Sequence, residues 1–225
     1  MEIEIQHGPG NAVARLRLAP GETTTAEGGA MIAMDGNVSI TTSTKSKGSG
    51  GLLKGLKRLV SGESFFLNHF TAGSGGGEVI VAATLAGDMM QYELKNETLI
   101  VQGGSFVAAE QGVAIDLGWQ GFKSMLSGES IFWVTLKGSG KVVVNSFGAI
   151  YPVEVNGSTI VDTGHIVAFN ETLNFTIVKA AKSWASSILG GEGLVCKFTG
   201  QGTVWCQSHN PSGFGRTIGP KLKPR

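Results

Sequence analysis

The sequence predicts an all-β fold made of three repeated units, and three observations support this. There are 35 glycines but only 6 prolines in 225 residues, which is typical of many short strands joined by tight turns. Apolar runs bounded by Gly, Asn or Ser occur at residues 79–83, 142–144 and 175–178, and no segment has a long helical period. Finally, one motif recurs at intervals of about sixty residues, which indicates a repeated supersecondary unit.

The recurring motif is a short amphipathic segment with Lys or Arg, followed by a Gly-Glu turn and an apolar run. Its three copies contain Glu63, Glu129 and Glu192. Upstream of each copy, a glycine precedes apolar residues, an alanine and a carboxyl or amide side chain. These glycines are Gly29, Gly104 and Gly164. Turn-forming residues give a third landmark, at 18–23, 94–98 and 155–159. Because the landmarks keep the same order, we expect these glutamates and glycines to be structurally equivalent.

The repeat divides the chain into four parts. Residues 1–90 hold a leading strand and the first repeat, which is the longest because a flexible basic loop is inserted at residues 45–51. The second repeat covers residues 91–150 and the third covers 151–210. Residues 211–225 form a basic tail rich in proline and glycine. A chain of this length can bury a full core as one large all-β unit.

The tail has two interpretations. Residues 210–225 contain three of the six prolines, four Lys or Arg residues and no acidic residue. The favoured interpretation is a poorly ordered or surface-draped end, because such composition is typical of chain ends. The alternative is a docking arm for an acidic partner.

Charge and targeting signals limit the function classes. The net charge of +1 does not predict a protein that binds polyanions, so nucleic acid is not an expected partner. Residues 1–5 are acidic and alternating, unlike the basic start of a signal peptide or the Arg-rich start of a transit peptide. No apolar run is long enough to cross a bilayer. We therefore expect a soluble, cytoplasmic protein.

Candidate catalytic and metal-binding groups are scattered. The histidines, at positions 7, 69, 165 and 209, include no His-x-His pair of the kind that builds a cupin-like metal site. The glycine-rich loops lie between strand-like runs, and none precedes Gly-Lys-Ser or Gly-Lys-Thr at the start of a helix. We expect no catalytic residue, no metal and no cofactor, and we do not expect an enzyme.

The repeated glutamates have a functional and a structural interpretation. Three equivalent carboxylates could form a threefold cluster for a metal or a proton. However, each follows a glycine at the entrance to a strand, where a carboxylate accepts N–H bonds of a turn or pairs with a lysine. Unpaired like charges would also destabilise the fold. We favour the structural interpretation for all three glutamates.

The two cysteines, Cys196 and Cys206, are expected on either side of a hairpin loop at residues 200–202. A three-residue loop would place them opposite each other, close enough for a cross-strand disulfide, and a two-residue loop would separate them. Because the chain has no secretory signal, free thiols that pack as small hydrophobic residues are favoured over a redox switch.

The amphipathic segments are the one repeated feature that could form a surface for binding another molecule. Each places apolar side chains on one helical face, with cations around the rest. The apolar residues that could form an association surface are Leu52, Leu56, Leu59, Trp119, Phe122, Trp184 and Ile188. One interpretation is that each helix only covers the end of the β-sandwich in its own unit. If the three faces are exposed together, they form a patch for self-association, a protein partner or an anionic membrane.

The repeated pattern, Gly-x-apolar-apolar-Ala-apolar followed by a Ser-Gly-Glu turn, resembles the mitochondrial-biogenesis family, named in yeast for altered inheritance of mitochondria. The resemblance covers roughly residues 10–210, and the lack of a transit peptide makes the chain more similar to the prokaryotic members. It implies three β-sandwich repeats like the trp RNA-binding attenuation protein (TRAP), in a pseudo-threefold arrangement with short amphipathic helices. It supplies no catalytic signature.

Two functions of different classes remain. The first is a non-catalytic structural, assembly or scaffold protein that self-associates, binds protein partners or contacts a membrane surface peripherally. The alternative, implied by the TRAP-like fold, is an RNA-binding module. That alternative requires cations and aromatic residues facing outward at repeated positions, and the repeats share none outside the amphipathic segments.

Overall fold

The computed structural model describes residues 1–45, 65–116, 133–179 and 194–223, and most of these residues lie in β-strands. A four-stranded sheet has the order β1-β2-β7-β4. A larger sheet has the order β12-β15-β13-β8-β11-β9-β3-β6-β5, with β10 joined to β11 and β14 joined to β15. The all-β fold class is confirmed.

Unit 2, which we define as residues 89–145, shows the pairing scheme most simply. It contains β8 (Met89–Gln102), η1 (Gly103–Ser105), β9 (Phe106–Glu110), β10 (Val113–Asp116) and β11 (Trp133–Asn145). The long strands β8 and β11 pair antiparallel along their whole length. On the other side of β11, β10 pairs with its first half and β9 with its second half.

Unit 3, defined as residues 150–207, has the same pairing. It contains β12 (Ile150–Asp162), η2 (Thr163–His165), β13 (Ile166–Asn170), β14 (Asn174–Lys179) and β15 (Leu194–Gln207). Here all of β12 pairs with β15, while β14 and β13 pair with the first and second halves of β15.

Unit 1, defined as residues 13–82, has this pairing with each long strand broken in two. It contains β2 (Val13–Leu18), β3 (Thr23–Glu27), β4 (Met31–Met34), β5 (Val38–Lys45), β6 (Phe65–Ala72) and β7 (Gly77–Ala82). The first break contains Pro20 and Gly21, whose φ is +73°, and these residues suit a turn rather than a ladder. As a result, β3, β5 and β6 join the large sheet, whereas β2, β4 and β7 join the small one. The leading strand β1 (Glu2–Gln6) pairs with β2.

A local contact recurs where each long strand bends. Side-chain oxygens of Asp35, Glu110 and Asn170 accept backbone N–H bonds at 2.8, 2.6 and 2.8 Å. The donors are the residues at matching positions, Glu78, Lys141 and Thr203. In each unit the strand before this polar residue also carries a register shift at its second position. The polar residue of the sequence landmark therefore accepts a backbone N–H from the strand with which its own strand pairs.

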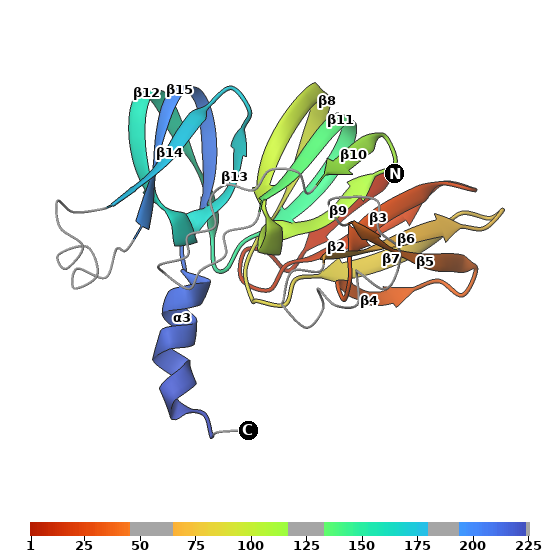
Figure 1. Cartoon of the computed structure of the whole chain (residues 1–225). Helices are drawn as coiled ribbons and strands as arrows, with labels where there is room; N and C mark the ends of the chain where they lie inside the picture. Colours follow the sequence, from red (N-terminus) through yellow and green to blue (C-terminus); the bar gives the residue numbers. More distant parts are fainter. Residues whose placement is uncertain (46–64, 117–132, 180–193, 224–225) are drawn as a thin grey trace.

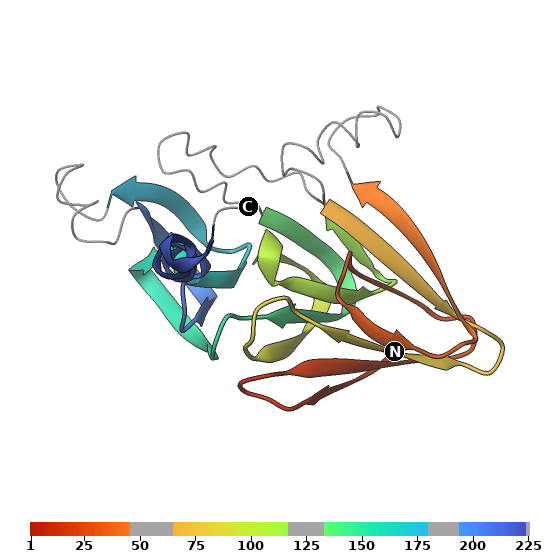
Figure 2. The same cartoon turned by 90° about the horizontal axis from the view of Figure 1, so that it is seen from below.

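The units are joined in series by strand pairing. Strand β9 of unit 2 pairs with β3 of unit 1, and β13 of unit 3 pairs with β8 of unit 2. Figure 1 and Figure 2 show the units in a row, with unit 3 at one end and unit 1 at the other. Three buried apolar clusters lie along this row. The third is rich in aromatic rings, and in it Trp133 packs edge-on against Phe169 with ring centroids 5.2 Å apart.

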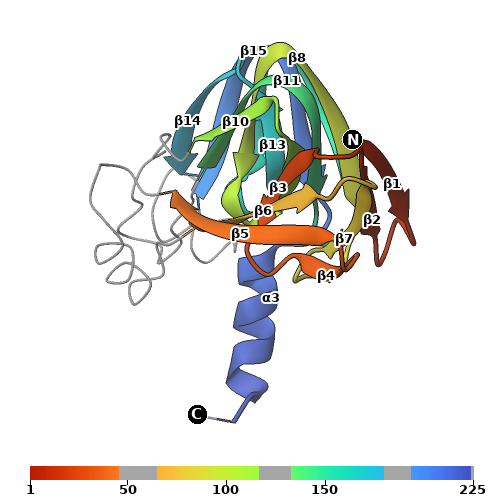
Figure 3. The ribbon, with the colours of Figure 1, turned by 90° about the vertical axis from the view of Figure 1, so that its right-hand side faces the viewer.

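The C-terminal segment is a helix, contrary to the expectation of a poorly ordered or surface-draped end. Helix α3 (Pro211–Ile218) and η3 (Gly219–Lys221) project away from the sheets, as Figure 1 and Figure 3 show. The Asn210 side chain accepts a bond from the Gly213 N–H at 3.1 Å, and Pro211 follows this N-cap at the first helical position. This pair is a standard helix start, which explains why the proline-rich tail becomes helical.

Candidate functional site

The base of α3 is fixed to the end of unit 3 by the loop that joins units 2 and 3. The Ser208 and His209 N–H groups donate to the carbonyls of Ala149 and Phe147 at 3.0 and 3.1 Å. The ring of Phe147 then packs against Phe214 of α3, edge to face, with centroids 5.3 Å apart. The helix therefore starts from a defined position, although none of its own residues is buried.

Two glycines leave room for this base. A Cβ atom at Gly148 would lie 2.2 Å from Nδ1 of His209, and the φ of Gly148 is +77°. A Cβ at Gly164 would lie 2.2 Å from Nδ2 of Asn210, the helix cap. A residue with a Cβ at either position would force the side chain of His209 or of Asn210 to move, because real Cβ atoms do not approach other atoms this closely.

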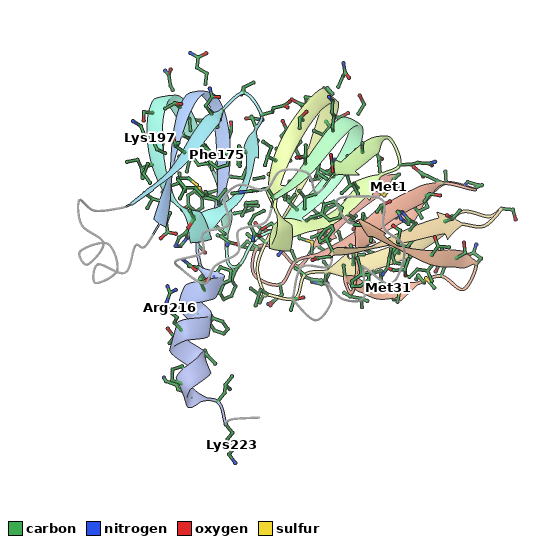
Figure 4. The ribbon with its side chains drawn as sticks, in the orientation of Figure 1. Met1, Met31, Phe175, Lys197, Arg216 and Lys223 are labelled. Carbon is green, nitrogen blue, oxygen red and sulfur yellow. The ribbon has the colours of Figure 1, made fainter. Side chains whose placement is uncertain are left out.

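The surface of α3 combines apolar and cationic groups. Phe214 is exposed, and Ile218 lies one turn further along on the same face. Leu222 is exposed just after η3. Arg216 lies on the helix and Lys223 near its end, as Figure 4 shows, with Lys221 between them. Residues 210–223 contain no Asp or Glu. Residues 210–223 therefore present apolar and cationic side chains without acidic ones.

Most of the sequence-predicted site residues lie outside the described residues. This applies to the repeated glutamates Glu63, Glu129 and Glu192. It also applies to every member of the predicted association surface, namely Leu52, Leu56, Leu59, Trp119, Phe122, Trp184 and Ile188. Their roles stay predictions.

The repeat glycines occupy matching chain positions but differ in local structure. Gly104 and Gly164 lie in the short 3-10 turns, where their N–H groups donate to side-chain oxygens of Gln102 and Asp162 at 2.8 and 2.7 Å. Gly29 instead has a φ of +92°, the left-handed conformation in which glycine is favoured.

The expected cysteine hairpin is wrong. Residues 200–202 continue through the middle of β15, so Cys196 and Cys206 lie ten positions apart along a single strand. At about 3.3 Å per residue this separates them by about 30 Å. Both are free and buried. Burial, together with Asp162, raises the pKa of Cys196 to about 12, and burial raises the pKa of Cys206 to about 11. Both thiols therefore remain protonated at neutral pH and are poor nucleophiles.

The described histidines that lie in or next to strands make structural contacts. His69 is held between Thr25 and Ser43, with ring nitrogens 2.9 and 2.7 Å from the two hydroxyls. Nδ1 of His165 lies 2.7 Å from the carbonyl oxygen of Gln207 and donates to it. Among residues 1–45, 65–116, 133–179 and 194–223, no three His, Cys, Asp or Glu side chains are grouped to hold a metal ion. In the same ranges, no helix has the length and apolar character that crossing a bilayer requires.

Sequence reasoning missed the apolar face of α3. The signals were present, because Asn-Pro at 210–211 is a typical helix start and the apolar residues Phe214, Ile218 and Leu222 follow at intervals of four. The glycines at 213 and 215 obscured them, since glycine disfavours helix interiors.

Together, the fold and this surface define a class of protein: β-sheet units joined in series, with a cationic helix projecting from the last. The chain belongs to the family described as Mitochondrial biogenesis AIM24, whose model matches residues 3–209. The resemblance seen in the sequence is thereby confirmed at the level of the family.

Two streptococcal proteins are similar to the chain. An uncharacterized protein of Streptococcus pyogenes serotype M6 is 31% identical over 196 residues, which cover 84% of this chain and 78% of that protein. A crystal structure of a Streptococcus pyogenes protein matches with a TM-score of 0.81 at 28% identity, covering 98% of this chain and 99% of that one.

Proposed function

We propose that this protein is a non-catalytic assembly protein that attaches peripherally to an anionic membrane surface through α3. The observation that carries the proposal is the projecting helix itself, with Phe214 and Ile218 on one face, cations around them and no acidic residue in residues 210–223. Amphipathic helices of this composition lie in the interface between lipid headgroups and acyl chains.

The non-catalytic part of the proposal is supported by the roles of the reactive side chains. The two thiols are buried with raised pKa values, and His69 and His165 are engaged in contacts within and between strands. These groups stabilise sheets rather than converge on a common point.

We also propose that the three units are TRAP-like, on the basis of their common pairing. A closed pseudo-threefold arrangement would require β4 to meet β12, because these strands correspond to the ones that join the units. Figure 1 places β4 and β12 at opposite ends of the row, which favours an open series.

Vesicle co-sedimentation tests the membrane proposal. The full chain should bind vesicles of phosphatidylcholine mixed with phosphatidylglycerol about tenfold more tightly than pure phosphatidylcholine, and added salt should weaken this binding. Replacing Phe214 and Ile218 with serine should reduce binding to both vesicle types. Lys221→Gln with Lys223→Gln should reduce only the phosphatidylglycerol-dependent part. The matched control is Ile40→Ser, an exposed isoleucine on β5, which should leave binding unchanged.

Two outcomes would contradict the proposal. Equal vesicle binding by the wild-type chain and by both helix variants would show that α3 is not the attachment site. Salt-sensitive binding of a single-stranded RNA with no binding to either vesicle would favour the RNA-binding alternative.

A further inference from the structure

The two junctions within the chain follow one rule. In each, a short strand of the later unit pairs antiparallel with the end of a long strand in the earlier unit. Ala108 of β9 faces Ala26 of β3, and Ala168 of β13 faces Val101 of β8. The later unit also contributes an apolar side chain to the core of the earlier one. These side chains are Val107, which belongs to the first apolar cluster, and Val167, which belongs to the second.

Strand β4 is the unit 1 equivalent of these joining strands. The pairing of β4 with β7 has the same register as the pairing of β9 with β11. In both cases the register shifts at the second residue of the short strand. However, Ile32 is 56% exposed, whereas its equivalents Val107 and Val167 are 1% and 0% exposed. Met31 is exposed as well. The described residues place no second strand beside β4.

Strand β12 is the complementary edge in unit 3. Its last residues correspond to the receiving ends of β3 and β8, because Asp162 and Gln102 occupy the same capping position before a 3-10 turn. Ile160 is 62% exposed, whereas its equivalent Ile100, at the junction of units 2 and 3, is 7% exposed. In the part of the chain that the structure describes, β15 is the sole strand partner of β12.

The chain thus carries both halves of a third junction without joining them. Figure 4 places Met31 of β4 and Lys197, the β15 partner of Ile160, at opposite ends of the molecule. The two edges of one copy are therefore too far apart to pair with each other. The β4 edge of one copy is complementary to the β12 edge of a second copy. The two internal junctions already use the same pairing register.

We propose that the β12 edge of one copy pairs antiparallel with the β4 edge of a second copy. The internal junctions set the register, so that Val161 faces Ala33, Ile160 faces Met34 and Thr159 faces Asp35. Ile32 would then enter the third apolar cluster of the neighbouring copy, as Val167 enters the second. This contact is head-to-tail, so it extends into an open series or closes into a ring. It is independent of membrane attachment through α3.

Sedimentation velocity over a range of concentrations, without vesicles, tests the proposal. The wild-type chain should associate, and a lysine on either edge, Ile32→Lys or Ile160→Lys, should raise the apparent dissociation constant at least about tenfold, because an edge charge opposes strand pairing. Ile40→Lys is the matched control, because Ile40 is also an exposed isoleucine on an edge strand but lies outside the proposed junction. It should associate like the wild type.

Mixing the two variants tests the direction of the contact. Ile32→Lys keeps an intact β12 edge and Ile160→Lys keeps an intact β4 edge, so an equimolar mixture should form a one-to-one dimer and nothing larger. Ala33→Cys in one chain and Val161→Cys in another should form a disulfide under mild oxidation, because directly opposed strand residues have suitable spacing. The native thiols are buried and should not compete.

Four outcomes would overturn the proposal. They are a wild-type chain that stays monomeric at every concentration, equal loss of association in the Ile40→Lys control, dimers formed by Ile32→Lys alone, and undiminished association of both edge variants. The last result would assign association to another surface. Circular dichroism of each variant should show an unchanged fold, since Ile32 and Ile160 are exposed in the single chain.

Discussion

Unit 1 and unit 3 have the same strand pairing but manage the middle of their long strands differently. In unit 3, β12 stays continuous through Gly157, whose φ is +101°, and every residue of β12 keeps a partner on β15. In unit 1, the turn at residues 19–22 breaks the equivalent strand into β2 and β3, which then belong to separate sheets. The left-handed Gly157 is therefore accommodated inside a paired strand of unit 3, whereas Pro20 and the left-handed Gly21 lie where the equivalent strand of unit 1 is interrupted.

The largest expected effect tests whether these units are nonetheless one cooperative structure. Phe70 and Phe198 are equivalent, fully buried and located in different apolar clusters. Replacing either with alanine should lower the free energy of unfolding by about 3–5 kcal/mol. Since strand pairing joins the units, both variants should shift one common calorimetric transition. Two transitions, each sensitive to only one variant, would show that the units unfold independently.

The ionisation of Glu27 in unit 1 should make the free energy of unfolding depend on pH. Burial raises the pKa of Glu27 to about 7, at the position where unit 2 has the uncharged Gln102. Because the folded chain resists ionisation of Glu27, this residue's contribution to the free energy of unfolding is most favourable below about pH 4.5. That contribution is lost as pH rises through 7. Glu27→Gln should therefore stabilise the protein by about 2–3 kcal/mol at pH 8 and hardly at all at pH 4.

Urea unfolding at the two pH values measures this difference. Glu154→Gln, which changes an exposed glutamate in unit 3, is the control and should have little effect at either pH. Equal stabilisation by Glu27→Gln at pH 4 and pH 8 would mean that ionisation of Glu27 does not limit stability.

The smallest expected effect compares the shared polar contact at the strand bends. Asn170→Ala removes the acceptor for the Thr203 N–H, in a partly buried site, and should cost about 1–2 kcal/mol. Asp35→Ala removes the equivalent acceptor in unit 1, where water can replace it, and should cost about 0.5 kcal/mol or less. Thermal unfolding of the two variants should preserve this order, and the reverse order would show that exposure does not decide the cost.

Part of this architecture could be predicted from the sequence. The strand-rich composition corresponds to the observed sheets, and the polar residues Asp35, Glu110 and Asn170 of the repeated pattern make a recurring contact. The repeated glutamates lie outside the described residues. The turn-forming residues, however, wrongly predicted turns. Asn96 and Gly157 have φ values of 56° and 101°, yet both lie inside the continuous strands β8 and β12. A left-handed residue produces either a turn or a bulge, and the choice depends on whether a partner strand continues alongside.

Burial of the joining strands could not be predicted for a related reason. Residues 29–35, 104–110 and 164–170 look alike in sequence, and local pattern predicts the same environment for all three. The structure buries β9 and β13 because an earlier unit lies beside each, and exposes β4 because unit 1 has no predecessor within the described chain. That difference depends on contacts between units rather than on residue type.

The direction of the junctions also has a consequence for biosynthesis. Each joining strand adds to the edge of a unit that lies earlier in the chain, so a completed unit can template the next one as the ribosome releases it. The receiving edge of the earlier unit therefore stays unpaired only until the joining strand of the next unit has been synthesised. The edge of β12 is the last of these receiving edges to be formed, and no later unit of the described chain covers it.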